Sequence, residues 1–353
     1  MPAKTVNKQD VIKAFEVILG RKPESPQAIA HHLGAVSHVD LVAGILASAE
    51  ANARISFLRQ SPFFHYNTSV DVRGIIENNI DHERKPREGH NVNFLGVAVP
   101  IEVFDFLADT GGTLDEVPLP SNYHADMAEW AAAIRPIDLA NKRFTMIELG
   151  SGWGCWMVNT GVVAKKRGLS VDLVGVEGDP KHVSLCHKTM ASNGILPSEY
   201  SIVRGVASAA SGVALFPKRQ PDESNWGFEP IFNATESMEQ ELVSSGAYEA
   251  LEMIPLHEVI GDRTLVDLLH LDIQGGEVDV IRGTLDILKE KVGYILIGTH
   301  SRVIEGELIG ILQSEGWVLE IERPAIFLVS TDGTLQTAVD GVQGWRNPKF
   351  HQG

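Results

Sequence analysis

A glycine-rich turn at the end of an apolar strand constrains the fold of this chain more than any other feature. Residues 146–149 read as a buried strand, and Gly150, Gly152 and Gly154 follow at alternating positions. Such a turn lets the backbone approach a ligand closely and leads into a helix with free N–H groups. A dinucleotide turn would carry its last glycine at position 155, where this chain has Cys155. The spacing therefore predicts a nucleoside-binding turn that is not of the dinucleotide type.

Strand and helix patterns alternate along the chain from residue 121 onward. Beyond the turn, buried strands are predicted at 172–179, 200–208, 265–275 and 293–300, with helical patterns at 180–194 and 276–291. After one more helix, residues 317–323 and 325–331 read as two strands of a terminal hairpin. The alternation predicts an α/β fold with a right-handed, doubly wound, mostly parallel sheet that ends in an antiparallel hairpin.

The N-terminal part has a different character. Residues 1–57 carry amphipathic helical patterns and predict a small all-α module. Residues 58–120 are punctuated by proline and glycine and are expected to form a linker region with some short structure. The main domain is expected at 121–353. The helical module resembles a short domain of unknown function found in bacterial surface and glycan-related proteins, which implies docking or homo-oligomerisation.

Composition restricts the partners. The formal net charge is −16, which argues against nucleic acid or an anionic membrane surface, because both bind fields of basic side chains. Cys155 and Cys186 are the two cysteines, too few for a disulfide scaffold, so a reducing cytoplasmic compartment is expected. The sequence has no run of about eighteen apolar residues, and we expect no membrane insertion.

The strand ends place candidate ligand-binding residues along one edge of the sheet. Ligands bind at the carboxyl ends of the strands in open α/β sheets. Glu177 ends the second strand, where a carboxylate can accept hydrogen bonds from both hydroxyls of a ribose. Gly205 and Val206 lie at the end of the third strand, where small residues let a flat base lie against the backbone.

Two further strand ends carry groups suited to proton transfer. Asp272 emerges from a buried strand and precedes two glycines and a helix, so it can orient a hydroxyl, accept its proton or bind a divalent cation. Glu277 begins that helix, where capping the helix and taking part in chemistry are both open to it. His300 ends the next strand and is a candidate general base, because an ordinary histidine pKa is about 6.5.

These motifs resemble a known family. Glu148 stands two residues before Gly150, as in motif I of class I S-adenosylmethionine-dependent methyltransferases, and residues 268–283, LLHLDIQGGEVDVIRG, with the later GTHSR phrase resemble the FkbM methyltransferases. The resemblance covers the chain from Ser121 and implies O-methylation of a sugar hydroxyl in a glycan, glycolipid, nucleotide sugar or glycosylated natural product. It assigns to S-adenosylmethionine the residues Glu148, Gly150, Ser151, Gly152, Trp153, Gly154, Glu177, Gly205, Val206 and Asp272.

The resemblance also assigns roles around the acceptor. Asp272, His300, Glu277 and Arg302 are the candidate catalytic residues, and Trp226 and Gln274 are the candidate substrate contacts. A divalent cation, if one takes part, would be held by Asp272 and Glu277.

Other functions remain open from the sequence. A nicotinamide-dependent oxidoreductase uses a similar sheet, but Cys155 and the terminal hairpin disfavour it. A non-catalytic scaffold of a surface-glycan assembly complex is disfavoured because the glycines, Glu177 and Asp272 are intact. Base methylation is disfavoured by the acidic charge and by Asp-Ile-Gln-Gly where an Asn/Asp-Pro-Pro-aromatic phrase is expected.

Overall fold

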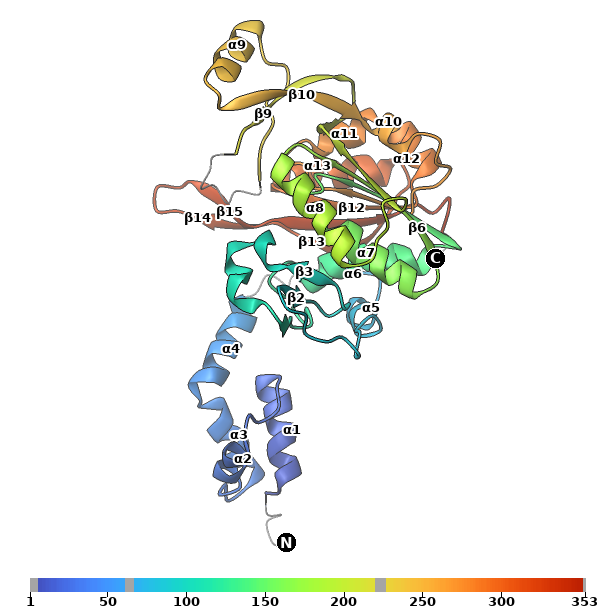
Figure 1. Cartoon of the computed structure of the whole chain (residues 1–353). Helices are drawn as coiled ribbons and strands as arrows, with labels where there is room; N and C mark the ends of the chain where they lie inside the picture. Colours follow the sequence, from blue (N-terminus) through green and yellow to red (C-terminus); the bar gives the residue numbers. More distant parts are fainter. Residues whose placement is uncertain (1–5, 61–66, 220–226, 352–353) are drawn as a thin grey trace. The chain divides into compact units, whose positions relative to one another are not determined.

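Two units make up the chain, residues 1–64 and residues 65–353 (Figure 1). The structure is a computed structural model, and it describes residues 6–60, 67–219 and 227–351. The first unit contains four helices: α1 (Lys8–Leu19), α2 (Pro26–His32), α3 (His38–Leu46) and α4 (Ala49–Gln60). The helices predicted for residues 1–57 are present, and the last of them continues to Gln60.

Local signals in the sequence set the ends of these helices. The side chains of Asn7, Ser25 and Ser37 accept hydrogen bonds from N–H groups in the first turns of α1, α2 and α3. Gly20 ends α1 in the left-handed conformation, with φ 70°. The apolar faces then pack on one another, and the core of this unit consists of Val6, Val11, Phe15, Leu19, Leu41, Ile45 and Ala51.

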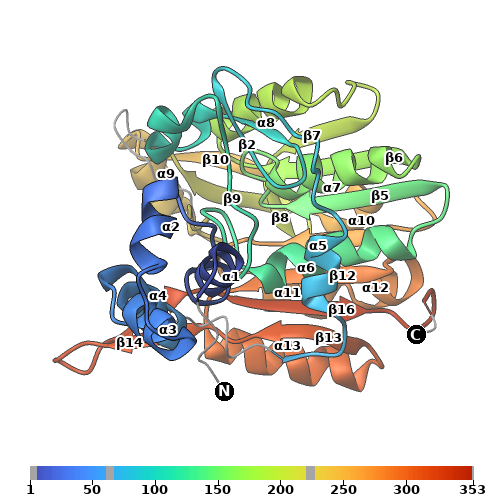
Figure 2. The ribbon, with the colours of Figure 1, turned by 90° about the horizontal axis from the view of Figure 1, so that it is seen from below.

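The second unit is built on an eight-stranded sheet with the order β1-β13-β16-β12-β11-β5-β6-β7. Figure 2 shows β6, β5, β12, β16 and β13 following one another in this order. The strands are β1 (Asn67–Thr68), β5 (Arg143–Leu149), β6 (Ser170–Glu177), β7 (Tyr200–Arg204), β11 (Leu268–Leu271), β12 (Tyr294–Thr299), β13 (Val318–Arg323) and β16 (Gly341–Arg346). The run from β7 to β12 is parallel, and β16 lies antiparallel between β12 and β13. This is the Rossmann-like sheet of class I methyltransferases that the sequence predicts.

The predicted terminal hairpin is wrong in its second strand. The strand β13 pairs with β16, whereas β14 (Ile326–Val329) pairs with β15 (Leu335–Val339) in a separate two-stranded ribbon. Burial explains the choice, because every residue of β16 is buried while Leu328 and Val329 of β14 are exposed. Only a buried strand can take a position in the middle of the sheet.

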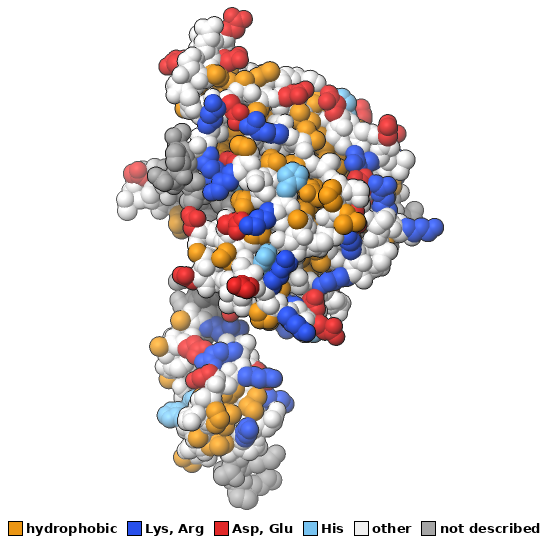
Figure 3. Space-filling view, in the orientation of Figure 1, with side chains coloured by type: hydrophobic (Ala, Val, Ile, Leu, Met, Phe, Trp, Pro, Cys, Tyr) orange, Lys and Arg blue, Asp and Glu red, His pale blue; other side chains and the backbone are white. Residues whose placement is uncertain are grey.

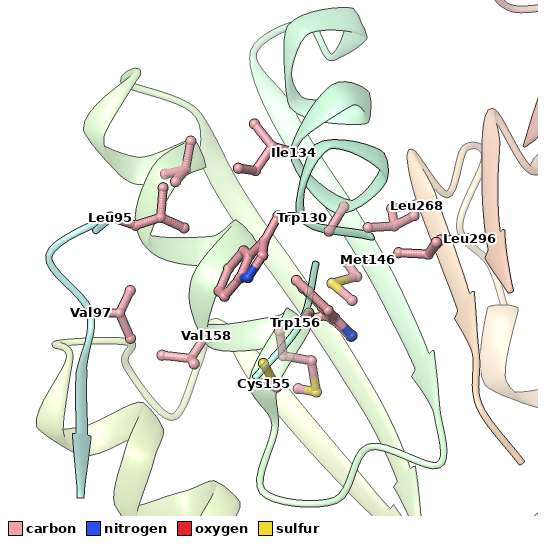
Figure 4. Packing of buried hydrophobic residues seen from close by; sticks show 14 of the residues in the cluster. Leu95, Val97, Trp130, Ile134, Met146, Cys155, Trp156, Val158, Leu268 and Leu296 are labelled. Atoms are coloured by element: carbon pink, nitrogen blue, oxygen red, sulfur yellow. The ribbon is translucent and has the colours of Figure 1, made fainter. Parts of the chain in front are cut away.

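Helices cover both faces of the sheet (Figure 1). One core cluster joins β5 and its neighbours to α6 (Met127–Leu139), α7 (Cys155–Lys166) and α8 (Pro180–Ser192). The opposite cluster joins the sheet to α10 (Leu256–Ile260), α11 (Glu277–Gly283), α12 (Leu285–Lys291) and α13 (Arg302–Ser314). In the first cluster the rings of Trp130 and Trp156 meet edge to face with centroids 4.8 Å apart (Figure 4).

The linker expected at 58–120 is largely an integral part of the second unit. From residue 67 the chain forms α5 (Val72–Glu77), β2 (His90–Val92), β3 (Ala98–Pro100), the 3₁₀ turns η2 (Ile101–Val103) and η3 (Asp105–Thr110), and β4 (Thr113–Leu114). Phe94, Val97 and Val99 of this segment are fully buried in the same core cluster as α6 and α7. Proline and glycine here mark turns between short buried pieces rather than a spacer.

Two other elements differ from the predicted pattern. The strand expected at 200–208 breaks at Gly205, and β8 (Val206–Ser208) leaves the main sheet to pair with β10 (Tyr248–Pro255), which also pairs with β9 (Gly212–Pro217). The helix expected at 276–291 is divided into α11 and α12 at Thr284. Between β9 and β10 lies α9 (Glu236–Ser244), over which acidic side chains gather in Figure 3.

Candidate active site

The parallel strands end at a cavity of about 550 Å³. Its lining includes Gly150 after β5, Glu177 at the end of β6, Asp272 after β11 and Gly298 in β12. These residues come from four neighbouring strands, so the site lies at the carboxyl edge of the sheet, where ligands bind in folds of this kind. The remaining wall comes from residues 104–156, from residues 205–207 after β7, from Phe216 and residues 227–232, and from the end of β13 and the start of β16.

The glycine turn combines two functions. Gly150 and Gly152 have positive φ angles and line the cavity. A Cβ atom on Gly150 would lie 2.0 Å from the carbonyl oxygen of Asp272, so only glycine lets β5 and β11 approach each other here. Gly154 does not line the cavity: a Cβ on it would lie 2.5 Å from the sulfur of Cys186. The first two glycines thus shape the site, and the third allows α7 to pack on α8.

Glu148 ends the strand that leads into the glycine turn, and its hydrogen bonds differ from those that the sequence predicts. The sequence predicts free N–H groups at the start of α7, but the carboxylate of Glu148 accepts hydrogen bonds from the N–H groups of Trp156 (3.3 Å) and Met157 (2.9 Å). Burial raises the pKa of Glu148 to about 8, against these two bonds, which lower it. Glu148 therefore anchors the start of α7 and leaves fewer of its N–H groups for a ligand.

Replacing Glu148 with glutamine is expected to change how stability depends on pH. Because the pKa of this carboxyl is higher in the folded state than its ordinary value of 4.5, its stabilising contribution is complete below pH 4.5 and is lost as pH rises towards 8. Relative to Glu148→Gln, the natural chain should lose roughly 3–4 kcal/mol of unfolding free energy between pH 5 and pH 8. Denaturant unfolding of both chains at the two pH values measures this difference. An equal change in unfolding free energy for the two chains between pH 5 and pH 8 would contradict the raised pKa of Glu148.

Glu177 holds the turn from the neighbouring strand. Its Oε2 accepts a hydrogen bond from the N–H of Gly152 at 2.7 Å, and its Oε1 accepts one from the N–H of Asp179, also at 2.7 Å. The side chain is 7% exposed and lines the cavity. A carboxylate fixed in this way keeps free lone pairs in a defined direction, as binding of a diol requires.

Asp272, Glu277 and His300 come together as the sequence predicts. His300 Nε2 lies 3.2 Å from Asp272 Oδ1, and His300 Nδ1 lies 3.3 Å from Glu277 Oε1. Glu277 is fully buried and also accepts hydrogen bonds from the N–H groups of Ile273 and Gly275, so it caps α11 as well. The imidazole thus lies between two carboxylates, with one ring nitrogen close to each.

Electrostatics favour the charged form of His300. Burial alone would lower its pKa, but the hydrogen bonds and charges of Asp272 and Glu277 outweigh burial and raise it to about 10. The pKa of Asp272 is likewise kept below its usual value: burial raises it, and the bond from His300 more than offsets that effect. Each of the three side chains offers one possible metal-ligand atom, and these atoms lie within 4.8 Å of one another. The three residues could therefore hold a divalent cation in place of the proton on His300.

Five other residues that the sequence assigns to the site line the cavity. Ser151, Trp153 and Val206 line the cavity, as does Gly205, where a Cβ would lie 2.6 Å from Ile254. Gln274 lines it too and donates a hydrogen bond from its Nε2 to Asp272 Oδ1 at 3.1 Å.

Arg302 does not line the cavity. It is exposed at the start of α13 and donates a hydrogen bond to the carbonyl of Ala325 at 3.1 Å. Its position in the GTHSR phrase suggested a catalytic role, but the first turn of α13 directs it to the segment after β13. Trp226 lies outside the described residues.

Several lining residues are not found by sequence reasoning. Phe104, Phe106 and Tyr123 belong to the segment read as a linker or to the residues just before α6, and His124 follows them. His270 stands two residues before Asp272 in β11, and alternation along that strand is the one signal that could have found it. Burial lowers the pKa values of both His124 and His270 to about 4, so both are neutral at pH 7.

Comparison with known proteins identifies the family. No family model matches the sequence. The chain is 42% identical over 268 residues to a protein of Jannaschia sp. (strain CCS1) named "Putative methyltransferase", and the match covers 76% of this chain and 95% of that protein. The chain belongs to the methyltransferases. The methyltransferase resemblance of the sequence is thereby confirmed.

Solved methyltransferase structures are also similar to this one. The methyltransferase FkbM of Methylobacillus flagellatus KT matches 58% of this chain with a TM-score of 0.38 and 13% identity, and the chain spans 44% of its length. The human methyltransferase 10 domain containing protein matches 69% of this chain and is itself covered over 94%, with a TM-score of 0.35 and 11% identity. In the part of this methyltransferase that the structure describes, no helix has the length and apolar character to cross a membrane.

Proposed function

We propose that this methyltransferase uses S-adenosylmethionine to methylate a hydroxyl group of a sugar. The observation that carries the proposal is the convergence on one cavity of the glycine turn, Glu177 and the Asp272–His300 pair. The FkbM-like phrase at 268–283 supports the choice of a sugar hydroxyl. The acidic sequence and the absence of a long apolar run support a cytoplasmic protein that binds neither nucleic acid nor membranes.

The residues at the turn fit the cofactor. Ser151 is 3% exposed and lines the cavity, and its buried hydroxyl has no hydrogen-bond partner among the described residues. A buried polar atom of this kind is satisfied when a polar ligand group binds beside it. Glu177 would take the ribose hydroxyls, and Gly150 and Gly152 would let the methionine part pass close to the backbone. When bound, S-adenosylmethionine supplies an electrophilic methyl group on a sulfonium.

Asp272 receives the proton that the acceptor hydroxyl loses, and the protonated His300 beside it holds its carboxylate in place. Asp272 Oδ1 is already bonded to His300 and Gln274, which leaves Oδ2 to accept a hydrogen bond from the hydroxyl. With His300 protonated and both carboxylates ionised, Asp272, Glu277 and His300 carry a net charge of −1. Uptake of one proton makes these three side chains neutral as a group, so the proton transfer creates no new pair of opposite charges in the cavity. Positioning of the hydroxyl and exclusion of water add to this effect.

Chelation tests whether Asp272, Glu277 and His300 hold a divalent cation in place of the proton on His300. Activity that survives EDTA would assign Asp272, Glu277 and His300 to proton transfer. Activity that is lost with EDTA and restored by Mg²⁺ would assign them to a cation site.

Calorimetric titration with S-adenosylhomocysteine tests the cofactor. We expect binding in the micromolar range, and we expect Glu177→Gln to weaken it by about tenfold or more, because hydrogen bonds to a charged group contribute about 1.5–3 kcal/mol. The matched control Glu307→Gln changes an exposed acid of α13 and should leave the affinity unchanged. Binding of NADH in place of S-adenosylhomocysteine would contradict the proposal and favour an oxidoreductase.

The first unit is proposed to dock the enzyme or to join two copies. Its four helices enclose their own small core and so can act as a separate module. A catalytically inactive scaffold is the remaining alternative. Full cellular function of an Asp272→Ala or His300→Ala chain would favour it.

A further inference from the structure

Three carboxyl groups face one part of the cavity. They belong to Glu129 of α6, to Asp272 after β11 and to Asp340, which directly precedes β16. Burial raises the pKa of Glu129 to about 8, and nearby carboxylates, Asp272 and Asp340 among them, add to this effect. Burial also raises the pKa of Asp340, and Asp272 again adds to the effect. Because a neighbouring charge shifts a pKa over a short distance only, the three carboxyl groups lie around a common space.

Positive charge does not balance these acids. Of the described residues that line the cavity, Arg323 is the only arginine or lysine, and its guanidinium contacts the buried carboxylate of Asp126. The protonated ring of His300 lies between two carboxylates and balances one of them. Negative charge is therefore in surplus around Glu129 and Asp340.

Glu129 and Asp340 also lack hydrogen-bond donors. The other acids that line the cavity, Glu148, Glu177 and Asp272, accept two hydrogen bonds each. Among residues 6–60, 67–219 and 227–351, no group donates a hydrogen bond to the side chain of Glu129 or Asp340 or forms an ion pair with it. An ionised carboxylate only accepts hydrogen bonds, so a ligand that binds these two residues must supply the donors.

A buried histidine gives an independent sign of a polar ligand in this part of the cavity. His270 stands two residues before Asp272, is 2% exposed and lines the cavity. Neither of its ring nitrogens has a hydrogen-bond partner in the described part of the chain, and Nδ1 lies 3.7 Å from Oε1 of Glu148. Buried polar groups in proteins almost always have a partner, so a ligand with hydrogen-bonding groups beside Asp272 would complete this site.

A protonated amine matches these requirements best. It carries one positive charge and three hydrogen-bond donors, whereas a hydroxyl carries no charge and one donor. A phosphate would add negative charge to a space that already has a surplus of it. Without a cation beside it Glu129 keeps its proton at pH 7, because its pKa is about 8, and an ammonium group would favour its ionised form. The charges of the cavity therefore favour a cationic acceptor.

We infer that the acceptor is an amino sugar whose protonated amine binds between Glu129 and Asp340 while its reacting hydroxyl lies at Asp272. The inference rests on the proposed function and narrows its substrate class. A protonated amine has no lone pair and cannot attack the methyl group. The hydroxyl oxygen instead forms the new bond to the methyl carbon as the bond from that carbon to sulfur breaks, and the hydroxyl proton passes to Asp272.

Saturation-transfer NMR at pH 7 on the full chain loaded with S-adenosylhomocysteine tests the inference. The probes are the methyl glycosides of glucosamine, 3-amino-3-deoxyglucose and 6-amino-6-deoxyglucose, each paired with its N-acetyl counterpart, which keeps the ring and loses the charge. We expect at least one amine to bind about tenfold more tightly than its counterpart. Glu129→Gln and Asp340→Asn should each remove most of this preference. The control Glu307→Gln removes an exposed acid outside the cavity and should keep it.

The outcomes separate this inference from the proposed function. Equal or tighter binding of the N-acetyl counterpart in every pair, or no binding of any amine to a chain that still binds S-adenosylhomocysteine, would overturn the cationic acceptor. A preference that persists in both variants would overturn its position, and Asp340 is exposed, so Asp340→Asn should fold even if Glu129→Gln does not. Weaker binding of S-adenosylmethionine or S-adenosylhomocysteine to Glu129→Gln would assign Glu129 to the cofactor and also overturn the inference. A natural chain that fails to bind S-adenosylhomocysteine would instead overturn the proposed function.

Discussion

Asp272→Asn is expected to lower kcat by about a hundredfold to ten-thousandfold, the usual contribution of a positioned acid–base group. Asparagine keeps the shape of the side chain but cannot take up the proton of the acceptor hydroxyl. It also removes one of the two carboxylates that keep His300 charged. The effect should appear in kcat, while the affinity for S-adenosylhomocysteine changes by no more than a few fold. Steady-state kinetics and calorimetry of the same preparation measure the two quantities.

Asp279→Asn is the matched control for this variant. Its carboxylate lies on the adjacent helix α11 with the side chain 89% exposed, so it changes the charge nearby without touching the cavity. Its kcat should equal that of the natural chain. Full activity of Asp272→Asn would show that the proton leaves by another route.

Gly150→Ala is expected to destabilise the chain and to weaken S-adenosylhomocysteine binding at least tenfold. The residue has φ 77°, which costs an alanine about 1–2 kcal/mol, and the new Cβ would lie 2.0 Å from the carbonyl oxygen of Asp272. Relieving that overlap must move β5 away from β11, at a further cost of about 1–3 kcal/mol. The same movement changes the cofactor turn and the position of Asp272. Denaturant unfolding and calorimetry check the two effects.

Gly168→Ala separates backbone strain from overlap. Gly168 has φ 80°, and a Cβ added to it would meet no atom of the described residues within 4 Å beyond its own chain neighbours, so alanine there carries the conformational cost alone. It should lower the unfolding free energy by about 1–2 kcal/mol and leave the binding of S-adenosylhomocysteine unchanged. Equal losses in the two variants would show that the close approach at Gly150 has no special importance.

The sequence predicts much of the site because parallel strands end at a common edge. Asp272 and His300 are far apart in sequence, yet each follows a strand of the same sheet, and β11 and β12 are neighbours. The topology therefore brings them together without knowledge of any side-chain contact. The same logic identified the turn at Gly150 and the carboxylate of Glu177, which end the two strands on the cofactor side.

Contacts that depend on long-range packing could not be predicted in this way. The wall with Phe104 and Phe106 comes from short irregular pieces that have no hydrophobic period to reveal them. The partner of β13 is β16, whose Gly and Gln residues do not suggest a buried strand. Arg302 stands in a motif but begins a helix, and the direction of its side chain is set by the first turn of α13.

Transfer of a labelled methyl group to a carbohydrate is the decisive measurement. The purified chain is incubated with S-adenosylmethionine that carries an isotopically labelled methyl group, together with a carbohydrate extract from a strain in which its gene is deleted, and the products are analysed by mass spectrometry and NMR. We predict a single labelled methyl ether on a hydroxyl of a sugar, and at most about a hundredth of that label in the same time when Asp272→Asn replaces the natural chain. Label on nitrogen, label in nucleic acid, or no label in the extract would contradict methylation of a sugar hydroxyl by this protein.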